Sequence, residues 1–214
     1  MRRTPKKMCK ATEIIKRYIL ENLKEYILVS IIMLIGVIIG VVFLNNMSEA
    51  QIRDIQTYLT NFTGELKDGK TINSGELLKK SLGSNLLLVF IMWFVGSTVI
   101  GIPIVLGMVL FRGFCLGYTI SAAVNVWGTG RGVIFFLTSM MLQNLIIIPC
   151  VIGMAVSGIK MYKSIIKDKR RENIKVEIIR HTIFFLIILA VLTVASFIEA
   201  YLSINLLVLC KEYF

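Results

Sequence analysis

Glu199 is the residue whose position most calls for a chemical explanation. It lies in the segment ASFIEAYLS, well inside the long apolar run 182–210. An ionised carboxylate in a bilayer is costly, so this side chain should be protonated, paired or turned toward water. Three roles are open: an interfacial residue at the end of an over-long span, a polar anchor between helices or subunits, and a proton-coupled transport site.

Two amide side chains, Gln143 and Asn144, lie near the middle of another apolar run, with Pro149 shortly after them. Amides at that depth need hydrogen-bond partners, either on a neighbouring helix or on the backbone that the proline frees. They could serve as structural contacts between helices or line a polar cavity, and both interpretations stay open.

Sequence motifs of enzymes are missing. The chain has no HExxH or GxSxG motif, no nucleotide-phosphate loop, and no pair of aspartates within an apolar run; its single histidine, His181, lies at the edge of one. The four cysteines are scattered, which favours buried apolar side chains over a disulfide framework or a zinc site. They are Cys9, Cys115, Cys150 and Cys210. We therefore expect no catalytic residue, no metal and no cofactor.

Composition identifies the class of protein. Of 214 residues, 56% are hydrophobic and 17% charged, and the mean hydropathy of +0.78 lies outside the range of soluble domains. The net charge of +11 is concentrated beside apolar runs, with eight Lys and Arg in residues 1–24 and eight more in residues 160–180. Such clusters are typical of the cytoplasmic flanks of membrane helices and, without a reading motif, do not indicate nucleic-acid binding.

The longest apolar stretch, Ser84–Trp127, carries one charge, Arg112. It is too long for one span, since about 20 residues cross the hydrocarbon core. We predict two helical arms joined at Phe111–Gly113, with the guanidinium in the headgroup layer and a bend near Pro103. The second arm is short enough to re-enter the membrane instead of crossing it, and it carries a face of small residues. These are Gly113, Gly117 and Ser121.

The segments before this hairpin predict a first span and an external helix. Gly36 and Gly40 in the first span form a GxxxG pair that permits close approach by another helix without identifying it. Ser48 and Gln51 then form a capping box that starts an amphipathic helix. Its apolar face would rest on the outer leaflet or bind a partner, and consists of Ile52, Ile55, Tyr58, Leu59 and Phe62.

The sequence thus predicts an all-α integral membrane protein with five transmembrane helices, a glycine-rich central hairpin and a short external amphipathic helix. The charge clusters place the N-terminus in the cytoplasm and the C-terminus outside. The predicted segments of this single domain (1–214) are a basic tail 1–25, spans 26–44, 83–110, 113–127, 133–159 and 182–209, an external segment 45–82, a turn 128–132 and a basic cytoplasmic loop 160–181.

This organisation resembles the stage II sporulation protein M family. The resemblance covers nearly the whole chain, and its most specific parts are the hairpin motif FRGFCLGYTISA, with Arg112, Gly113 and Gly117, and the acidic last span IEAYLS, with Glu199. It implies a five-span plasma-membrane protein of endospore-forming bacteria that acts in engulfment. It also implies two partners, an amidase/endopeptidase and a lytic transglycosylase, which carry out the cell-wall chemistry while this chain acts as their scaffold.

A transporter or permease subunit is the alternative. It would use Gln143, Asn144 and Glu199 as a polar path, with bends at Pro103 and Pro149. Five spans without an evident inverted repeat disfavour a self-sufficient transporter, although a homo-oligomer could supply the missing half. Membrane lipid is a partner under either interpretation.

Overall fold

In a computed structural model, the described residues are 17–67, 74–98, 101–138, 142–167 and 171–198, and the account below refers to them alone. They form long helices, and no strand occurs among them. The labelled helices are α2 (Leu23–Asn45), α3 (Glu49–Lys67), α4 (Ser74–Gly96), α5 (Gly101–Phe136), α6 (Leu142–Lys167) and α7 (Arg171–Ile198). A helical turn at residues 17–21 leads into α2.

Five of these helices are long and apolar enough to cross a membrane. The candidate spans are Leu23–Asn45, Leu78–Gly96, Gly101–Phe136, Asn144–Ile166 and Ile174–Phe197. Helices satisfy their backbone hydrogen bonds internally, as a lipid environment demands. The predicted fold class, an all-α multi-pass membrane protein, is confirmed.

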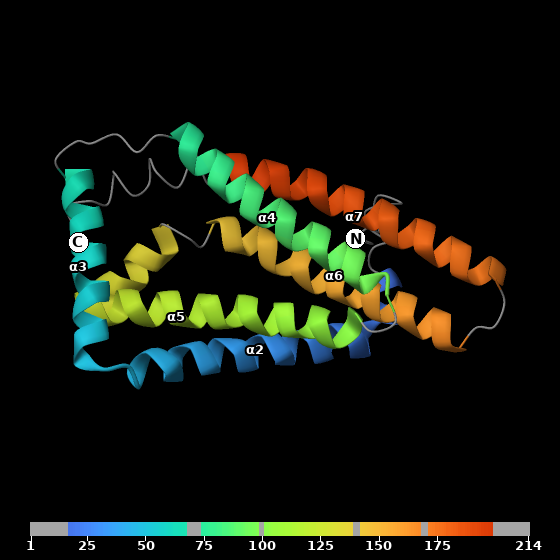
Figure 1. Ribbon diagram of the computed structural model, residues 1–214, viewed down its shortest axis with the longest axis horizontal. Helices are drawn as coiled ribbons and strands as arrows, with labels where there is room; N and C mark the ends of the chain where they lie inside the picture. The colour runs from blue at the N-terminus through green and yellow to red at the C-terminus, as the bar shows by residue number, and fades with distance from the viewer. Residues whose placement is uncertain (1–16, 68–73, 99–100, 139–141, 168–170, 199–214) are drawn as a thin grey trace, which may run out of the picture.

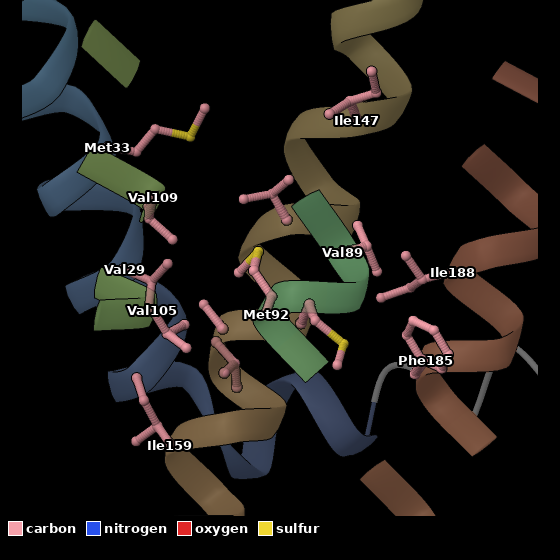
Figure 2. Close-up of a cluster of buried hydrophobic side chains, with 14 of the residues drawn as sticks. Val29, Met33, Val89, Met92, Val105, Val109, Ile147, Ile159, Phe185 and Ile188 are labelled. Atoms are coloured by element: carbon pink, nitrogen blue, oxygen red, sulfur yellow. The ribbon is translucent and has the colours of Figure 1, made fainter. Parts of the chain in front are cut away.

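The five helices run along a common direction, with α2 beside α5 and α4 beside α7 (Figure 1). Half of the α6 span is buried, against 17–28% for the other four, which makes α6 the central helix. Its buried side chains meet those of α2, α4, α5 and α7 in one apolar cluster (Figure 2). The cluster includes Val29, Val89, Met92, Val105, Val109, Val151, Met154 and Leu192.

The break that divides the central stretch lies elsewhere than predicted. Residues 111–113 are inside α5, and the chain reverses after Gly96 instead. The hydroxyl of Ser97 donates to the Trp93 carbonyl (2.8 Å) and that of Thr98 donates to the Val95 carbonyl (2.7 Å), which satisfies the last carbonyls of α4. Pro103 lies in the first turn of α5, where a missing N–H costs nothing, and does not bend a helix there.

The predicted span 133–159 takes in the last residues of α5 and most of α6, and residues 139–141 between these helices lie outside the described part of the chain. The chain breaks at Gly128, within the predicted turn, where φ is +79°, and the last part of α5 folds back on the first. The Trp127 and Phe135 rings are in contact with their centroids 4.4 Å apart and their planes inclined by 41°, and a Cβ on Gly132 would lie 2.5 Å from the Ala123 carbonyl oxygen. Consequently α6 starts part of the way along α5 and not at the end of the bundle (Figure 1).

The predicted amphipathic helix is present as α3. The backbone N–H of Ser48 donates to the Gln51 side chain (3.2 Å) and the N–H of Gln51 points back to the Ser48 hydroxyl (3.5 Å), so the capping box is confirmed. Figure 1 shows α3 crossing one end of the bundle at a steep angle to the other helices, and it packs against α5. We call this end the α3 end. At the other, the basic end, lie the start of α2 with the turn before it, the end of α4, the start of α5, the end of α6 and the start of α7.

Candidate functional site: helix contacts and the two ends of the bundle

The four glycines singled out in the sequence lie opposite one another where α2 crosses α5. A Cβ added to Gly36 or Gly40 would collide with α5 backbone, and one added to Gly113 or Gly117 would collide with α2 backbone. The two helices are therefore in backbone contact over two turns, a separation that only glycine permits. The carbonyls reached from these glycines belong to Leu110, Phe114, Met33 and Val37, in that order.

Arg112 lies beside this glycine contact and not in a headgroup layer. Its neighbour Gly113 contacts Met33, which is near the middle of α2, so the guanidinium is well inside the bundle. The Nη2 group of Arg112 donates to the Asn144 Oδ1 (3.1 Å), and Asn144 is 7% exposed in the first turn of α6. The bond joins the early start of α6 to the middle of α5.

At the α3 end, the predicted partner-binding face is divided. Ile52, Ile55 and Leu59 are half-buried, whereas Tyr58 is 73% exposed. Nearby, the Ser121 hydroxyl donates to the Asn45 Oδ1 (3.4 Å), joining α5 to the last residue of α2. Three predicted residues are not placed: the side chains of Phe62 and Gln143, and all of Glu199, lie outside the described part of the chain.

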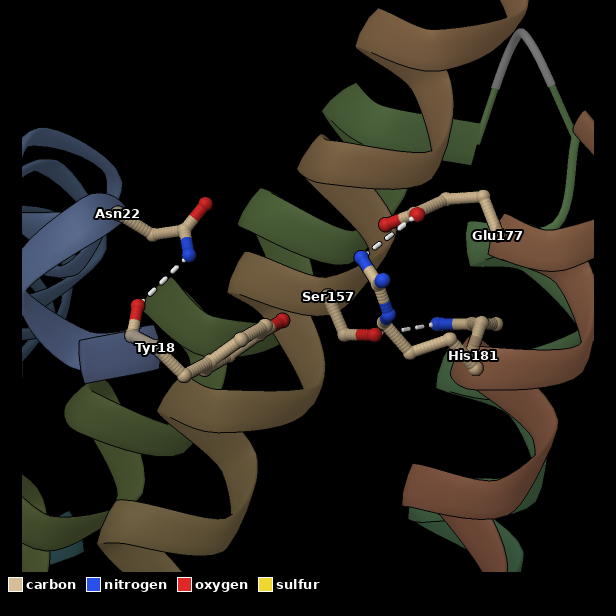
Figure 3. A network of polar contacts seen from close by, with 6 residues as sticks. Tyr18, Asn22, Ser157, Glu177 and His181 are labelled. Atoms are coloured by element: carbon tan, nitrogen blue, oxygen red, sulfur yellow. Dashed lines mark hydrogen bonds and ion pairs between the residues drawn. The ribbon is translucent and has the colours of Figure 1, made fainter. Parts of the chain in front are cut away.

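Sequence reasoning missed a buried polar contact toward the basic end. His181 of α7 is 1% exposed, and its Nδ1 lies 2.8 Å from the Ser157 hydroxyl of α6 (Figure 3). One residue further along α6, Gly158 meets Gly96 of α4, since a Cβ on Gly96 would lie 3.6 Å from the Gly158 Cα. The adjacent serine and glycine in the apolar α6 sequence were the available signal for this close crossing.

A second missed contact joins α4 to α7 in the half nearer the α3 end. Asn85 is 6% exposed and Ser196 is fully buried. The Asn85 amide donates to the Ser81 hydroxyl (3.3 Å) and to the Ser196 hydroxyl (3.5 Å). Buried polar groups of this kind hold two membrane helices together, each bond contributing about 0.6–2 kcal/mol.

The start of α2 and the turn before it are fixed against α6 at the basic end. The Lys163 ammonium pairs with the Glu25 carboxylate, and the Lys160 ammonium lies 4.7 Å above the Tyr18 ring. Burial is the largest of the effects that raise the pKa of Tyr18 to about 12, so its hydroxyl is neutral at physiological pH. All of these groups hold helices together. Among the described residues, no three His, Cys, Asp or Glu side chains are placed to hold a metal ion.

One comparison with known proteins identifies the family of this chain. The family model described as stage II sporulation protein M matches residues 29–204, which include every described helix from α3 to α7 and most of α2. Searches of curated proteins and of solved structures found no match. The family match covers most of the chain, so the chain belongs to the stage II sporulation protein M family and is a sporulation-related multi-pass membrane protein.

Proposed function

We propose that this chain is a membrane scaffold that recruits and positions peptidoglycan hydrolases for septal thinning and engulfment during endospore formation. The proposal rests on membership of the family and on one observation, the position of α3. This helix is capped by side chains, lies across the end of the bundle and carries the exposed Tyr58. An exposed tyrosine on a rigid helix is a common anchor in protein interfaces, because its large ring is ordered at little entropic cost.

The proposed orientation in the plasma membrane puts α3 on the cell-wall side. Residues 17–25 and the described part of 160–180 lie together at the basic end, opposite α3. Under the positive-inside rule that end faces the cytoplasm, which leaves the N-terminus inside, α3 outside and the C-terminus outside. The hydrolases are the expected source of the chemistry, an amidase/endopeptidase and a lytic transglycosylase.

The division of the α3 face refines which residues would bind the hydrolases. Ile52, Ile55 and Leu59 are already half-buried, so they are expected to hold α3 in place. Tyr58 and the exposed polar positions beside it, such as Asp54 and Asn61, are available to a partner. We do not propose the transport alternative, because Asn144 of its polar path is buried and bonded to Arg112.

The proposal is tested by crosslinked co-purification from membranes of sporulating cells. Peptidoglycan hydrolases should be recovered with the wild-type chain and reduced at least several-fold with Tyr58→Ser. The matched control is Thr57→Ser, one position along and also exposed, which should leave recovery unchanged. Absence of hydrolases from the wild-type sample would overturn the scaffold. Equal recovery with Tyr58→Ser would keep the scaffold and move its contact away from this residue.

A further inference from the structure

The charged side chains of the basic end are arranged with the cations outermost. Lys163 is 50% exposed and its partner Glu25 17%, while Arg180 is 50% exposed and its partner Glu177 13%. Arg180 Nη1 lies 2.9 Å from the Glu177 Oε2, so the pair is formed with the carboxylate recessed. Two of the three described carboxylates at this end are thus drawn into the bundle. The surface presents mainly positive groups even where charges are paired.

Further cations without a recessed partner complete this surface. Arg17 is 81% exposed, and its pair with Glu21, within one helical turn, is itself in solvent. Lys24 and Lys175 are also exposed. We call the set Arg17, Lys24, Lys163, Lys175 and Arg180 the cationic rim. It is built from three segments of the chain: the turn at 17–21 with α2, the end of α6, and the start of α7.

Exposed aliphatic side chains lie in the same helical turns as the rim. Ile19 and Leu20 follow Arg17, and Ile166 follows Lys163. Val176 and Ile179 lie between Lys175 and Arg180. The exposed fractions of these five side chains range from 38% to 59%. On α7 the exposed apolar face then continues to Phe197. At 1.5 Å per residue, Val176 to Phe197 spans about 30 Å, the thickness of a hydrocarbon core. The rim therefore stands where that core meets the headgroups.

We propose that the cationic rim binds anionic phospholipid headgroups of the leaflet at the basic end. A lipid offers a phosphate to the cations and acyl chains to the aliphatic side chains in the same helical turns, so it matches both features at once. A nucleic acid or a free phosphate would satisfy the cations and leave the aliphatic residues in water. The α3 end lacks this arrangement, because its exposed Arg53, Lys79 and Lys80 are accompanied by the exposed carboxylates Glu49 and Asp54.

The test measures lipid selectivity of the full chain in nanodiscs of phosphatidylcholine and phosphatidylglycerol in equal amounts. Spin-labelled versions of both lipids report their relative association with the protein. The wild-type chain should prefer phosphatidylglycerol by about fivefold or more, the preference that one cation near a headgroup contributes. The variant Arg17→Gln/Lys24→Gln/Lys175→Gln should reduce the preference several-fold, and it leaves the recessed ion pairs intact. The charge-matched control Arg53→Gln/Lys79→Gln/Lys80→Gln removes three exposed cations at the other end and should keep the preference.

Three results would overturn the proposal. Equal selectivity in the wild-type chain and the rim variant would overturn it, and so would an equal loss in the control, which would attribute selectivity to net charge alone. Competition by soluble glycerol phosphate at millimolar concentration would identify a site for free phosphate and overturn the assignment to lipid. The charge-conserving variant Arg17→Lys/Lys24→Arg/Lys175→Arg should retain the preference, which separates lost binding from misfolding.

Discussion

The glycine contact between α2 and α5 allows the sharpest test of the packing argument. We consider Gly117→Ala. The added methyl group would overlap the Val37 carbonyl and lie 2.8 Å from its carbon, and both atoms are backbone that no rotamer change can move. Accommodation therefore requires the two helices to separate along their length. Overpacking of this kind costs about 1–3 kcal/mol, and we expect a value toward the upper end of that range here, because backbone must be displaced.

The greater helix propensity of alanine offsets part of this destabilisation. Alanine favours the helical conformation over glycine by about 1 kcal/mol, so the net loss of unfolding free energy should be about 1–2 kcal/mol. The control is Gly107→Ala on the same helix, where no atom beyond the glycine's own helical turn lies within 4 Å of the added Cβ. That variant gains the helical preference with no collision and should be neutral or more stable by up to about 1 kcal/mol. The two substitutions are chemically identical, so their difference isolates the contact.

Reversible unfolding in mixed micelles, followed by circular dichroism, measures both variants against the wild-type chain. Gly117→Ala should unfold at a clearly lower denaturant fraction than Gly107→Ala. Equal unfolding free energies for the two variants, within about 0.5 kcal/mol, would refute backbone contact between these helices. Gly40→Ala provides an independent repeat from the opposite helix, because its methyl group would lie 2.8 Å from the Tyr118 backbone nitrogen.

Two further predictions concern buried polar contacts. Arg112 and Asn144 should show a coupling energy of about 1–2 kcal/mol in a double-mutant cycle with Arg112→Leu and Asn144→Leu, measured by the same unfolding assay, because the bond is charge-assisted and part-buried; additive effects would contradict it. Ser157→Ala should cost about 1–3 kcal/mol because it leaves the buried Nδ1 of His181 without that hydroxyl, and a stability within about 0.5 kcal/mol of wild type would show that the contact contributes nothing.

The amphipathic helix α3 was predictable because its signals are local. The Ser48–Gln51 capping box and the spacing of the apolar residues are properties of one segment, and the structure has the helix where they place it. The break at Gly128 was likewise indicated by a glycine-rich turn. The number of spans followed from hydropathy alone, because the bilayer fixes how many apolar residues cross it.

The position of the α4–α5 reversal was not predictable from the same rules. Placing Arg112 at the turn assumed that a lone charge marks a membrane surface. In the structure that charge lies inside the bundle, because Asn144 of a helix thirty-two positions away supplies an acceptor. The true signal was the pair Ser97–Thr98 ahead of Gly101, whose hydroxyls bond carbonyls of the turn before them. Polar residues that end a helix are inconspicuous beside a charge.

That these four glycines contact one another could not be predicted from the sequence either, because small-residue pairs at this spacing are common and do not indicate which helix they contact. The contact between these glycines determines how α3 is held against the rest of the protein. This helix leaves α2 after the short link Asn46–Ser48 and packs against α5, so it is attached to both members of the closest helix pair. A helix held at one end by its chain connection and along one face by packing has little freedom to tilt. If α3 positions hydrolases at the cell wall, the rigidity required for that task comes from the glycine contact. Gly117→Ala should then weaken hydrolase recovery even though it lies far from Tyr58, whereas Gly107→Ala should not.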